Sequence, residues 1–136
     1  MENEELVTRF YAEVWNAWNH DSAYELLHPK LTFRGSLGRR TQGVPEFLDY
    51  VAEVRGAFPD FHNQVDDLAL DGPRAIARLT YSGTHRGDVL GFSPTGNRIR
   101  YSGIAWFTCS EGRIVDGFVL GDVDALRSQL AAPPVA

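Results

Sequence analysis

The sequence predicts an α+β fold in which helices at the N-terminus pack against one face of an antiparallel sheet. Up to about Asp60 the hydrophobic residues recur with the period of a helix, and after Phe61 they alternate with a period of two. The alternating segments are joined in pairs by two turn sequences, Asp71-Gly72-Pro73 and Ser110-Glu111-Gly112. Helices followed by hairpins favour this class over an alternating βαβ chain.

Three helices are expected before the sheet. The segment Glu4–Asn19 begins with acidic residues, which suit a helix N-terminus, and carries one broad apolar stripe. Ser22 and Glu25 have the spacing of a capping box and predict a short helix to about Leu27, which Pro29 ends. A third helix begins near Pro45 and closes at Phe58-Pro59-Asp60.

The strands are expected in the second half, after one short strand at Leu31–Phe33 and a glycine-rich loop with Arg39 and Arg40. Asp122 is placed to cap a last helix, Val123–Leu130. We expect one domain over residues 1–130 and a flexible tail over residues 131–136. The four longer strand candidates are Phe61–Leu70, Arg74–His85, Arg98–Cys109 and Arg113–Leu120.

Composition narrows the class of protein. The chain has 136 residues, 43% of them hydrophobic and 23% charged, which is typical of one folded domain. Its net charge of -5 argues against nucleic acid or an anionic membrane as partner. The acidic start is unlike a signal peptide, and no apolar run approaches the ~20 residues of a membrane span. A single cysteine, Cys109, excludes an internal disulfide and predicts a reduced, cytoplasmic protein.

Motifs for common cofactors and nucleophiles are missing. Gly83, Gly87 and Gly91 form neither a phosphate-binding loop nor a dinucleotide fingerprint. The four histidines lack the spacing of metal ligands, and no nucleophile elbow is present. We therefore expect no metal and no cofactor, with Cys109 as a small core residue.

One set of motifs resembles a known family. The stretch Gly83-Thr84-His85-Arg86-Gly87, then Gly91 and Pro94-Thr95-Gly96, is similar to the SnoaL-like polyketide cyclase family. Phe58-Pro59-Asp60, the Gly112-Arg113-Ile114 turn and Gln129-Leu130 extend the resemblance from the Trp15 helix to Leu130. It implies an NTF2-like cone, in which a curved sheet and helices enclose a mainly apolar pocket. Members named as cyclases close polyketide rings by a cofactor-free aldol reaction, and many relatives form homodimers through the outer sheet face.

The resemblance also implies an aspartate and a histidine as the acid/base pair on the last two strands. The corresponding positions, counted from Gly112, are Val119 and Ala105, and neither side chain can move a proton. The expected inner face of this hairpin is therefore a smooth apolar wall, with space left by Gly103 and Gly117. The wall residues are Tyr101, Gly103, Ala105 and Phe107 opposite Val115, Gly117 and Val119.

Four residues are candidate catalytic groups, each with a structural alternative. His85 has a side chain suited to proton transfer near neutral pH, or it pins its turn. Tyr101 is placed to donate to a substrate oxygen, or it is a core aromatic. Arg78 binds an anionic group if it points inward and is a solvated charge if it points outward. Asp122 is an acid or a helix cap, and Asp116 shares its strand face.

The aromatic residues supply the expected substrate-binding wall. In a cone fold the core and the pocket wall are the same surface, so helical and strand aromatics serve both. The candidates for substrate binding are Trp15, Phe33, Tyr50, Phe58, Phe61, Trp106 and Val119.

Three functional hypotheses remain open. The first is a cofactor-independent enzyme acting on a polyketide-like or polycyclic aromatic molecule by ring closure, isomerisation or hydration, without the Asp/His pair. The second is a non-catalytic binding or dimerisation module. The third is a relative of epoxide hydrolases or hydroxylases, which requires His85, Arg78 and Asp122 to converge.

Overall fold

The computed structural model describes residues 1–135. Its helices are α1 (Asn3–Arg9), the π-helix η1 (Phe10–Trp15), α2 (His20–Leu26), α3 (Val44–Ala57) and α4 (Val123–Leu130). Its strands are β1 (Leu27–Arg34), β2 (Arg40–Gln42), β3 (His62–Asp71), β4 (Arg74–Thr84), β5 (Arg98–Ser110) and β6 (Arg113–Gly121).

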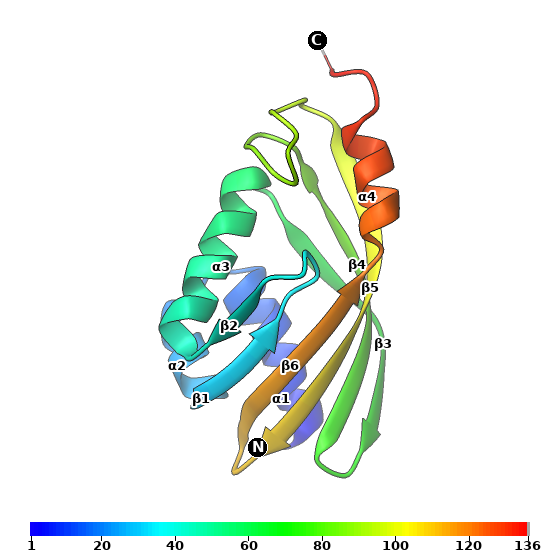
Figure 1. The fold of residues 1–136 in the computed structure, drawn as a ribbon. Helices are drawn as coiled ribbons and strands as arrows, with labels where there is room; N and C mark the ends of the chain where they lie inside the picture. Colours follow the sequence, from blue (N-terminus) through cyan, green and yellow to red (C-terminus); the bar gives the residue numbers. More distant parts are fainter. Residues whose placement is uncertain (136) are drawn as a thin grey trace.

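Six strands form one curved, unclosed sheet in the order β2-β1-β6-β5-β4-β3. The N-terminal helices and α3 cover one side of this sheet, whereas α4 packs along β5 (Figure 1). The α+β class and the helices-then-hairpins order are confirmed. One pairing differs from an antiparallel sheet, because β1 runs parallel to β6, with Phe33 beside Gly117.

The first helix ends earlier than its apolar stripe predicts. After α1 the chain widens into η1, whose last turn is closed by the Asn16 N–H donating to the Tyr11 carbonyl at 2.9 Å. Trp18 then takes a φ of 58°, outside any right-handed helix. The prediction of a helix to Asn19 is therefore wrong, because the helical segment ends with the π-helix at Trp15, four residues sooner.

The predicted capping box of α2 is also wrong. Asn19 caps this helix by accepting a hydrogen bond from the Ser22 N–H at 3.1 Å. The Ser22 hydroxyl instead donates to Glu13 at 2.6 Å, so it is not free to cap. Glu25, the other member of the predicted box, binds Arg9. Both side chains of the expected capping box are therefore bonded to residues of the preceding helical segment instead.

The first strand is longer than predicted and reaches back past Pro29. Pro29 lies where the ladder between β1 and β6 shifts register, between Leu27 and Thr32, so its missing N–H costs no ladder bond. The glycine-rich loop contains the short strand β2, which pairs with the end of β1. α3, the four long strands and the Asp122 cap of α4 all form close to their predicted bounds.

Burial alternates along β4 and β5 and confirms most of the predicted inner face. The wall position predicted for Val115 is wrong, because the register shifts after Thr108 and the buried Ile114 lies opposite Cys109 instead. In β5 the side chains of Tyr101, Ala105 and Phe107 are buried, and their neighbours in sequence face outward. The register places Ala105 opposite Val119 and Phe107 opposite Gly117. The concave side of the sheet is thus the apolar face that the helices cover.

The chain beyond α4 lies against the connection between β4 and β5. The Val135 N–H donates to the Thr95 carbonyl at 2.9 Å and to Asn97 Oδ1 at 3.1 Å. The flexibility expected of residues 131–136 stays a prediction, and Ala136 lies outside the described residues. Within residues 1–135, no helix has both the length and the apolar character needed to cross a membrane.

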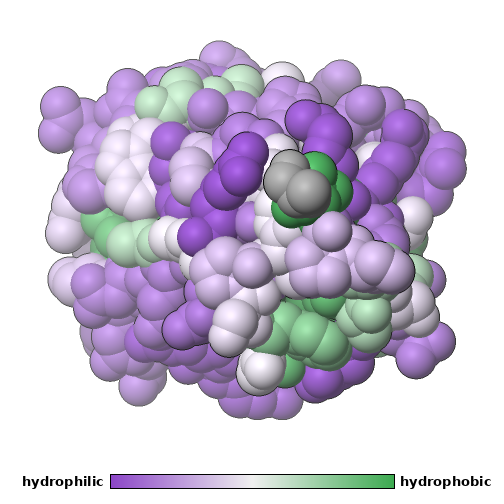
Figure 2. Space-filling model, turned by 90° about the horizontal axis from the view of Figure 1, so that it is seen from above, coloured by the Kyte–Doolittle hydropathy of each residue, from purple (hydrophilic) through white to green (hydrophobic). Residues whose placement is uncertain are grey.

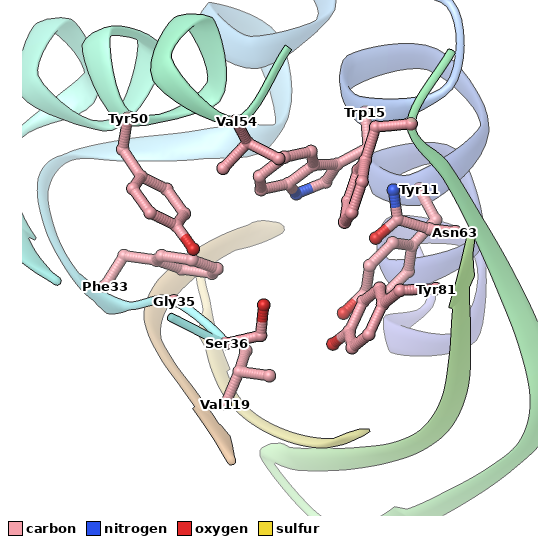
Figure 3. A pocket seen from close by; sticks show the side chains of 11 residues that line it. Tyr11, Trp15, Phe33, Gly35, Ser36, Tyr50, Val54, Asn63, Tyr81 and Val119 are labelled. Atoms are coloured by element: carbon pink, nitrogen blue, oxygen red, sulfur yellow. The ribbon is translucent and has the colours of Figure 1, made fainter. Parts of the chain in front are cut away.

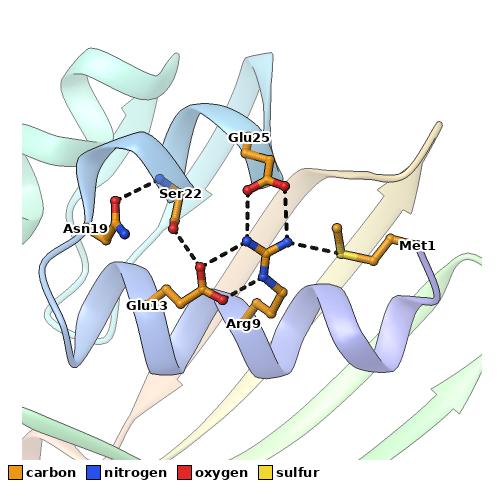
Figure 4. Close-up of polar contacts among 6 residues, drawn as sticks. All are labelled: Met1, Arg9, Glu13, Asn19, Ser22 and Glu25. Carbon is orange, nitrogen blue, oxygen red and sulfur yellow. Dashed lines mark hydrogen bonds and ion pairs between the residues drawn. The ribbon is translucent and has the colours of Figure 1, made fainter.

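An ion-pair network fixes η1 from its outer side (Figure 4). Arg9 donates to Glu13 at 2.6 Å and to Glu25 at 2.8 Å, linking the first helical segment to α2. The hydrogen bonds from Arg9 and then Ser22 lower the pKa of Glu13 to about 2, from 4.5. Because η1 carries aromatic residues on its inner side, this network sets where those rings lie.

We expect Glu13→Gln to lower the melting temperature at about pH 6 and to have no effect near pH 2. The depressed pKa of Glu13 means that its ionised form stabilises the fold above about pH 4.5 and that this contribution disappears as the pH falls toward 2. Thermal unfolding followed by circular dichroism across this range measures both values. Glu5→Gln, an exposed change on α1, is the control; an equal response from both variants would contradict the network's role.

Candidate functional site: a tyrosine-lined cavity

A small cavity lies between the concave face of the sheet and the helices η1 and α3 (Figure 3). Its volume is about 10 Å³, which is room for about one water molecule. Residues from six elements, from the loop after β1 and from the connection before β3 surround it. The lining residues are Tyr11, Trp15, Phe33, Gly35, Ser36, Tyr50, Val54, Phe61, Asn63, Tyr81 and Val119.

The cavity is small because aromatic rings lie directly on glycines. A Cβ atom at Gly103 would be 2.6 Å from the Tyr81 ring, and one at Gly117 would be 2.6 Å from Phe33. The expectation that these two glycines leave open space is therefore wrong. Rings from β4 and β1 occupy the volume that side chains on β5 and β6 would otherwise fill, as close packing requires.

Two phenol groups face the cavity without a protein partner. The side chains of Tyr11 and Tyr81 are each 3% exposed, and their hydroxyls point into the void from the same side (Figure 3). Neither hydroxyl has a hydrogen-bond partner within residues 1–135. Buried hydroxyls normally find a partner, so this pair is free to bind a ligand oxygen.

The other two tyrosines near the cavity are already bonded. The Tyr101 hydroxyl shares a hydrogen bond of 2.9 Å with Ser36 Oγ, and the Tyr50 hydroxyl accepts from the Leu37 N–H at 3.4 Å. Tyr101, predicted as a donor, is thus buried beside the site with its hydroxyl engaged locally. Its ring contacts Tyr81, with centroids 4.8 Å apart.

Burial keeps these tyrosines neutral. It raises the pKa of Tyr11, Tyr81 and Tyr101 well above the ordinary tyrosine value, because a phenolate would lose its hydration. Tyr50 shifts the same way, partly offset by the Leu37 N–H. At physiological pH the hydroxyls are therefore O–H donors and not bases.

The cavity lining contains no carboxylate, imidazole, amine or thiol. Its polar groups are hydroxyls, the Trp15 indole N–H and the Asn63 side-chain amide. The backbone N–H of Asn63 donates to Asn16 Oδ1 at 2.9 Å and so fixes the position of this residue. Among residues 1–135, no group of three His, Cys, Asp or Glu side chains is placed to hold a metal. The site can donate hydrogen bonds but holds no side chain that readily accepts a proton.

His85 lies outside the cavity lining and is fully buried. Its Nδ1 accepts from the Thr95 N–H at 3.2 Å and shares a 2.9 Å hydrogen bond with the Thr95 hydroxyl. Its Nε2 has no partner, and its ring packs against Phe58. In this position His85 holds the Gly83–Gly87 stretch against Pro94-Thr95-Gly96, which is the structural alternative named for it.

Asp60 ties the same motif to the end of α3. Its carboxylate accepts from the Thr84 N–H at 2.6 Å and from the Thr84 hydroxyl at 2.7 Å. Asn97 completes the junction by donating to the carbonyls of Gln129 and Ala132. The motifs that carry the family resemblance therefore fasten the end of the cone, and their contacts are structural.

The remaining polar candidates lie outside the cavity, where Arg78 and Asp122 line one hollow on the outer face of the sheet without His85. Arg78 is exposed on the outer face of β4, so the inward orientation is excluded. Asp122 caps α4 by accepting from the Ala125 N–H at 3.0 Å. Asp116 accepts from the Thr32 hydroxyl at 2.5 Å, also away from the cavity. The convergence of His85, Arg78 and Asp122 is absent.

The predicted substrate-binding residues divide into three groups. Five of them line the cavity, namely Trp15, Phe33, Tyr50, Phe61 and Val119. Phe58 is buried behind Phe61, at 5.9 Å between ring centroids. Trp106 is 47% exposed on the outer face of β5, because alternation along the strand turns it away from its buried neighbours.

Two important lining residues, Tyr11 and Tyr81, were not among the predicted site residues. Each carried a usable signal in the sequence. Tyr81 lies an even number of residues after Ala77 and Leu79 on β4, so its side chain points to the same face of the strand. Tyr11 lies on the apolar stripe of the first helix. The unpartnered state of their hydroxyls required the structure.

We expect Gly117→Ala to lower the free energy of unfolding by about 1–3 kcal/mol, because the new methyl group would overlap the Phe33 ring. Denaturant unfolding at equilibrium measures the change. Gly56→Ala, which adds a methyl group in open space on α3, is the matched control and should not destabilise. Equal stability of the two variants would show that Phe33 is not packed on Gly117.

The fold is shared with several solved structures. A SnoaL-like protein from Jannaschia sp. CCS1 aligns with a TM-score of 0.87 at 23% identity, covering 97% of this chain and 93% of that one. TsrD from Streptomyces laurentii gives 0.85 at 24%, covering 97% and 98%. IdmH from Streptomyces antibioticus gives 0.83 at 22%, covering 97% and 100%. A comparison with curated proteins finds no significant match.

The sequence itself assigns the family. The family model described as SnoaL-like polyketide cyclase matches residues 5–130, which span every helix and strand except the first two residues of α1. The resemblance noted in the motifs is confirmed over this range, and with the fold it supports a small-molecule cyclase-type function. The chain belongs to the SnoaL-like polyketide cyclase family.

Proposed function

We propose that this protein is a cofactor-independent enzyme that binds a polyketide-like or polycyclic aromatic carbonyl compound inside the cone. The observation that carries the proposal is the pair of buried, unpartnered hydroxyls of Tyr11 and Tyr81, which face the cavity. Neutral O–H donors in a buried site bind a carbonyl oxygen and stabilise it further as negative charge develops. The aromatic walls supply the contact surface for a flat molecule.

Intramolecular ring closure suits this set of groups. In an aldol closure one C–H bond breaks, one C–C bond forms, and the carbonyl oxygen becomes a hydroxyl, so the proton ends within the product. No side chain of the lining accepts that proton, and a water molecule is the carrier that the cavity can hold. Rate enhancement then comes from donation to the oxygen and from confinement, which can remove ~7–11 kcal/mol of barrier.

A non-catalytic binding protein is the second candidate. The lining has donors but no proton acceptor, which favours this alternative. The relation to epoxide hydrolases or hydroxylases has less support, because His85 lies beneath the β4–β5 connection, away from the outer-face hollow that Arg78 and Asp122 line. Product detected by mass spectrometry after incubation with aromatic polyketide esters would favour the enzyme, and ligand-induced stabilisation without product would favour the binding protein.

We further propose a homodimer of a cytoplasmic protein, formed through the outer face of the sheet. Two cross-strand pairs, Ile104 with Leu120 and Trp106 with Phe118, lie side by side on β5 and β6. All four side chains are exposed, from 37% for Phe118 to 57% for Leu120. Such a contiguous apolar patch fits a second copy of the chain, and the net charge of -5 disfavours nucleic acid or an anionic membrane.

We expect Leu120→Lys to convert a dimer into a monomer, because it places a charge in the centre of the apolar patch. Sedimentation velocity at matched concentrations measures the species present. Tyr24→Lys, at an exposed aromatic residue on α2, is the control and should leave the dimer intact. A wild-type chain that sediments as a monomer would refute this interface.

We expect Tyr11→Phe and Tyr81→Phe each to weaken binding of an aromatic ketone about tenfold, the effect of about 1.4 kcal/mol of lost hydrogen bonding. Prodan, a fluorescent naphthyl ketone, is a suitable probe for equilibrium titration. Because these hydroxyls have no protein partner, the same changes should not lower the free energy of unfolding. Tyr24→Phe is the surface control; no binding by wild type, or unchanged affinity in both variants, would reject the carbonyl site.

A further inference from the structure

We infer that ligands reach the cavity through a surface groove beside α3, and that the Tyr50 ring lying on Gly35 is the gate between groove and cavity. The inference rests on the proposed function of the cavity, because a gate matters only if a ligand enters. It adds to that function an access route for the ligand and one side chain, Tyr50, that must move to open it.

The groove is an open hollow of about 450 Å³, within the range of small-molecule sites. It lies between α3 and two loops, residues 35–39 and 86–92, at the end of the molecule where the β4–β5 connection lies (Figure 1). Its apolar side chains are Leu37, Val54, Val89 and Leu90, all at least half-buried. Figure 2 looks onto this end, where hydrophobic patches interrupt a mostly hydrophilic surface.

The groove and the cavity share a wall. Tyr50 and Val54, one turn apart on α3, are the two residues that line both spaces. Figure 3 shows the Tyr50 side chain reaching from α3 across toward Gly35 and Ser36, with its hydroxyl inside the cavity. Moving this one ring outward would join a space that holds one water to a groove that holds a ligand.

The closed position of Tyr50 is held by ring packing against Trp15 and Phe33 and by a single long hydrogen bond. Its hydroxyl accepts one long hydrogen bond of 3.4 Å from the Leu37 N–H, and its ring meets Trp15 edge-on at 5.9 Å. Gly35 is what admits the ring, because a Cβ atom there would overlap it. Tyr50 is 2% exposed, so moving it outward exposes an aromatic ring, and the open state is a minor one. The hydroxyl itself loses only one long hydrogen bond when the ring moves.

The groove also selects the kind of ligand. Its floor is apolar, whereas its rim carries the Arg39–Glu53 ion pair and Asp88. Beyond the gate lie neutral phenols and aromatic rings, with no ionised group in the lining. An uncharged, flat carbonyl compound satisfies both parts of this route, and a strongly anionic molecule would leave its charge unpaired inside.

The gate can be tested without any ligand, by the reactivity of a thiol placed behind it. Val119 is 3% exposed on the cavity floor, and Val119→Cys provides the reporter. The native Cys109, 6% exposed and outside the lining, reports general opening of the fold in the same molecule. The probe is N-ethylmaleimide, an uncharged thiol reagent, and peptide mass spectrometry follows both sites separately.

In this background Gly35→Ala displaces the Tyr50 ring, and we expect it to speed labelling at position 119 about tenfold by raising the open population. Labelling of Cys109 should stay unchanged. Gly56→Ala, on the groove's outer edge, is the control and should alter neither rate. If Gly35→Ala folds poorly, Tyr50→Leu, which shortens the gate, should produce the same selective increase.

Two results would overturn the gate. An equal rise at both thiols would mean general destabilisation, and no rise at position 119 in either gate variant would mean another route. Failure of the proposed function looks different. It would appear as absent or Tyr11- and Tyr81-independent ketone binding, while the labelling rates still responded to Gly35→Ala.

Discussion

The strong curvature of the sheet creates a concave face that must be filled, and aromatic rings lying on glycines fill it. Phe33 rests on Gly117 and Tyr81 on Gly103, each at a distance that excludes any side chain on the glycine. Close packing of these rings leaves a cavity with room for only about one water molecule, so the rings determine its size and its lining. The cone of this protein is therefore closed by its own side chains, and binding requires one of them to move.

Filling a core with tyrosine has a chemical consequence that phenylalanine would not have. Tyr11 and Tyr81 bring hydroxyls into a site that raises their pKa and offers them no partner. The hydroxyls face a cavity with room for about one water molecule, so they are available to bind a ligand oxygen in its place. The network of Arg9, Glu13 and Glu25 holds η1, and with it Tyr11, on the opposite side of the cavity from β6.

Much of the fold was predictable because β4 and β5 each bury one face, and the alternation of hydrophobic residues reveals that face. The same rule applied consistently would have excluded Trp106, which lies one residue from the inner positions Ala105 and Phe107. The π turn at Phe10–Trp15 was not predictable, since its register depends on contacts of Glu13 with other segments. Nor was the filling of the glycine sites, because a glycine in a strand indicates close approach without naming what approaches.

The motifs and the site are separate in this chain. His85, Thr84 and Asp60 belong to the motifs that carry the resemblance, and their hydrogen bonds hold the β4–β5 connection together and tie it to the segment after α3. The positions where the resemblance places acid and base are Val119 and Ala105, paired directly on the inner face. The free donors lie on η1 and β4 instead. If this cone acts on a carbonyl compound, its chemistry uses donors on η1 and on β4, the strand beside β5, and proton transfer there must use water or the substrate itself.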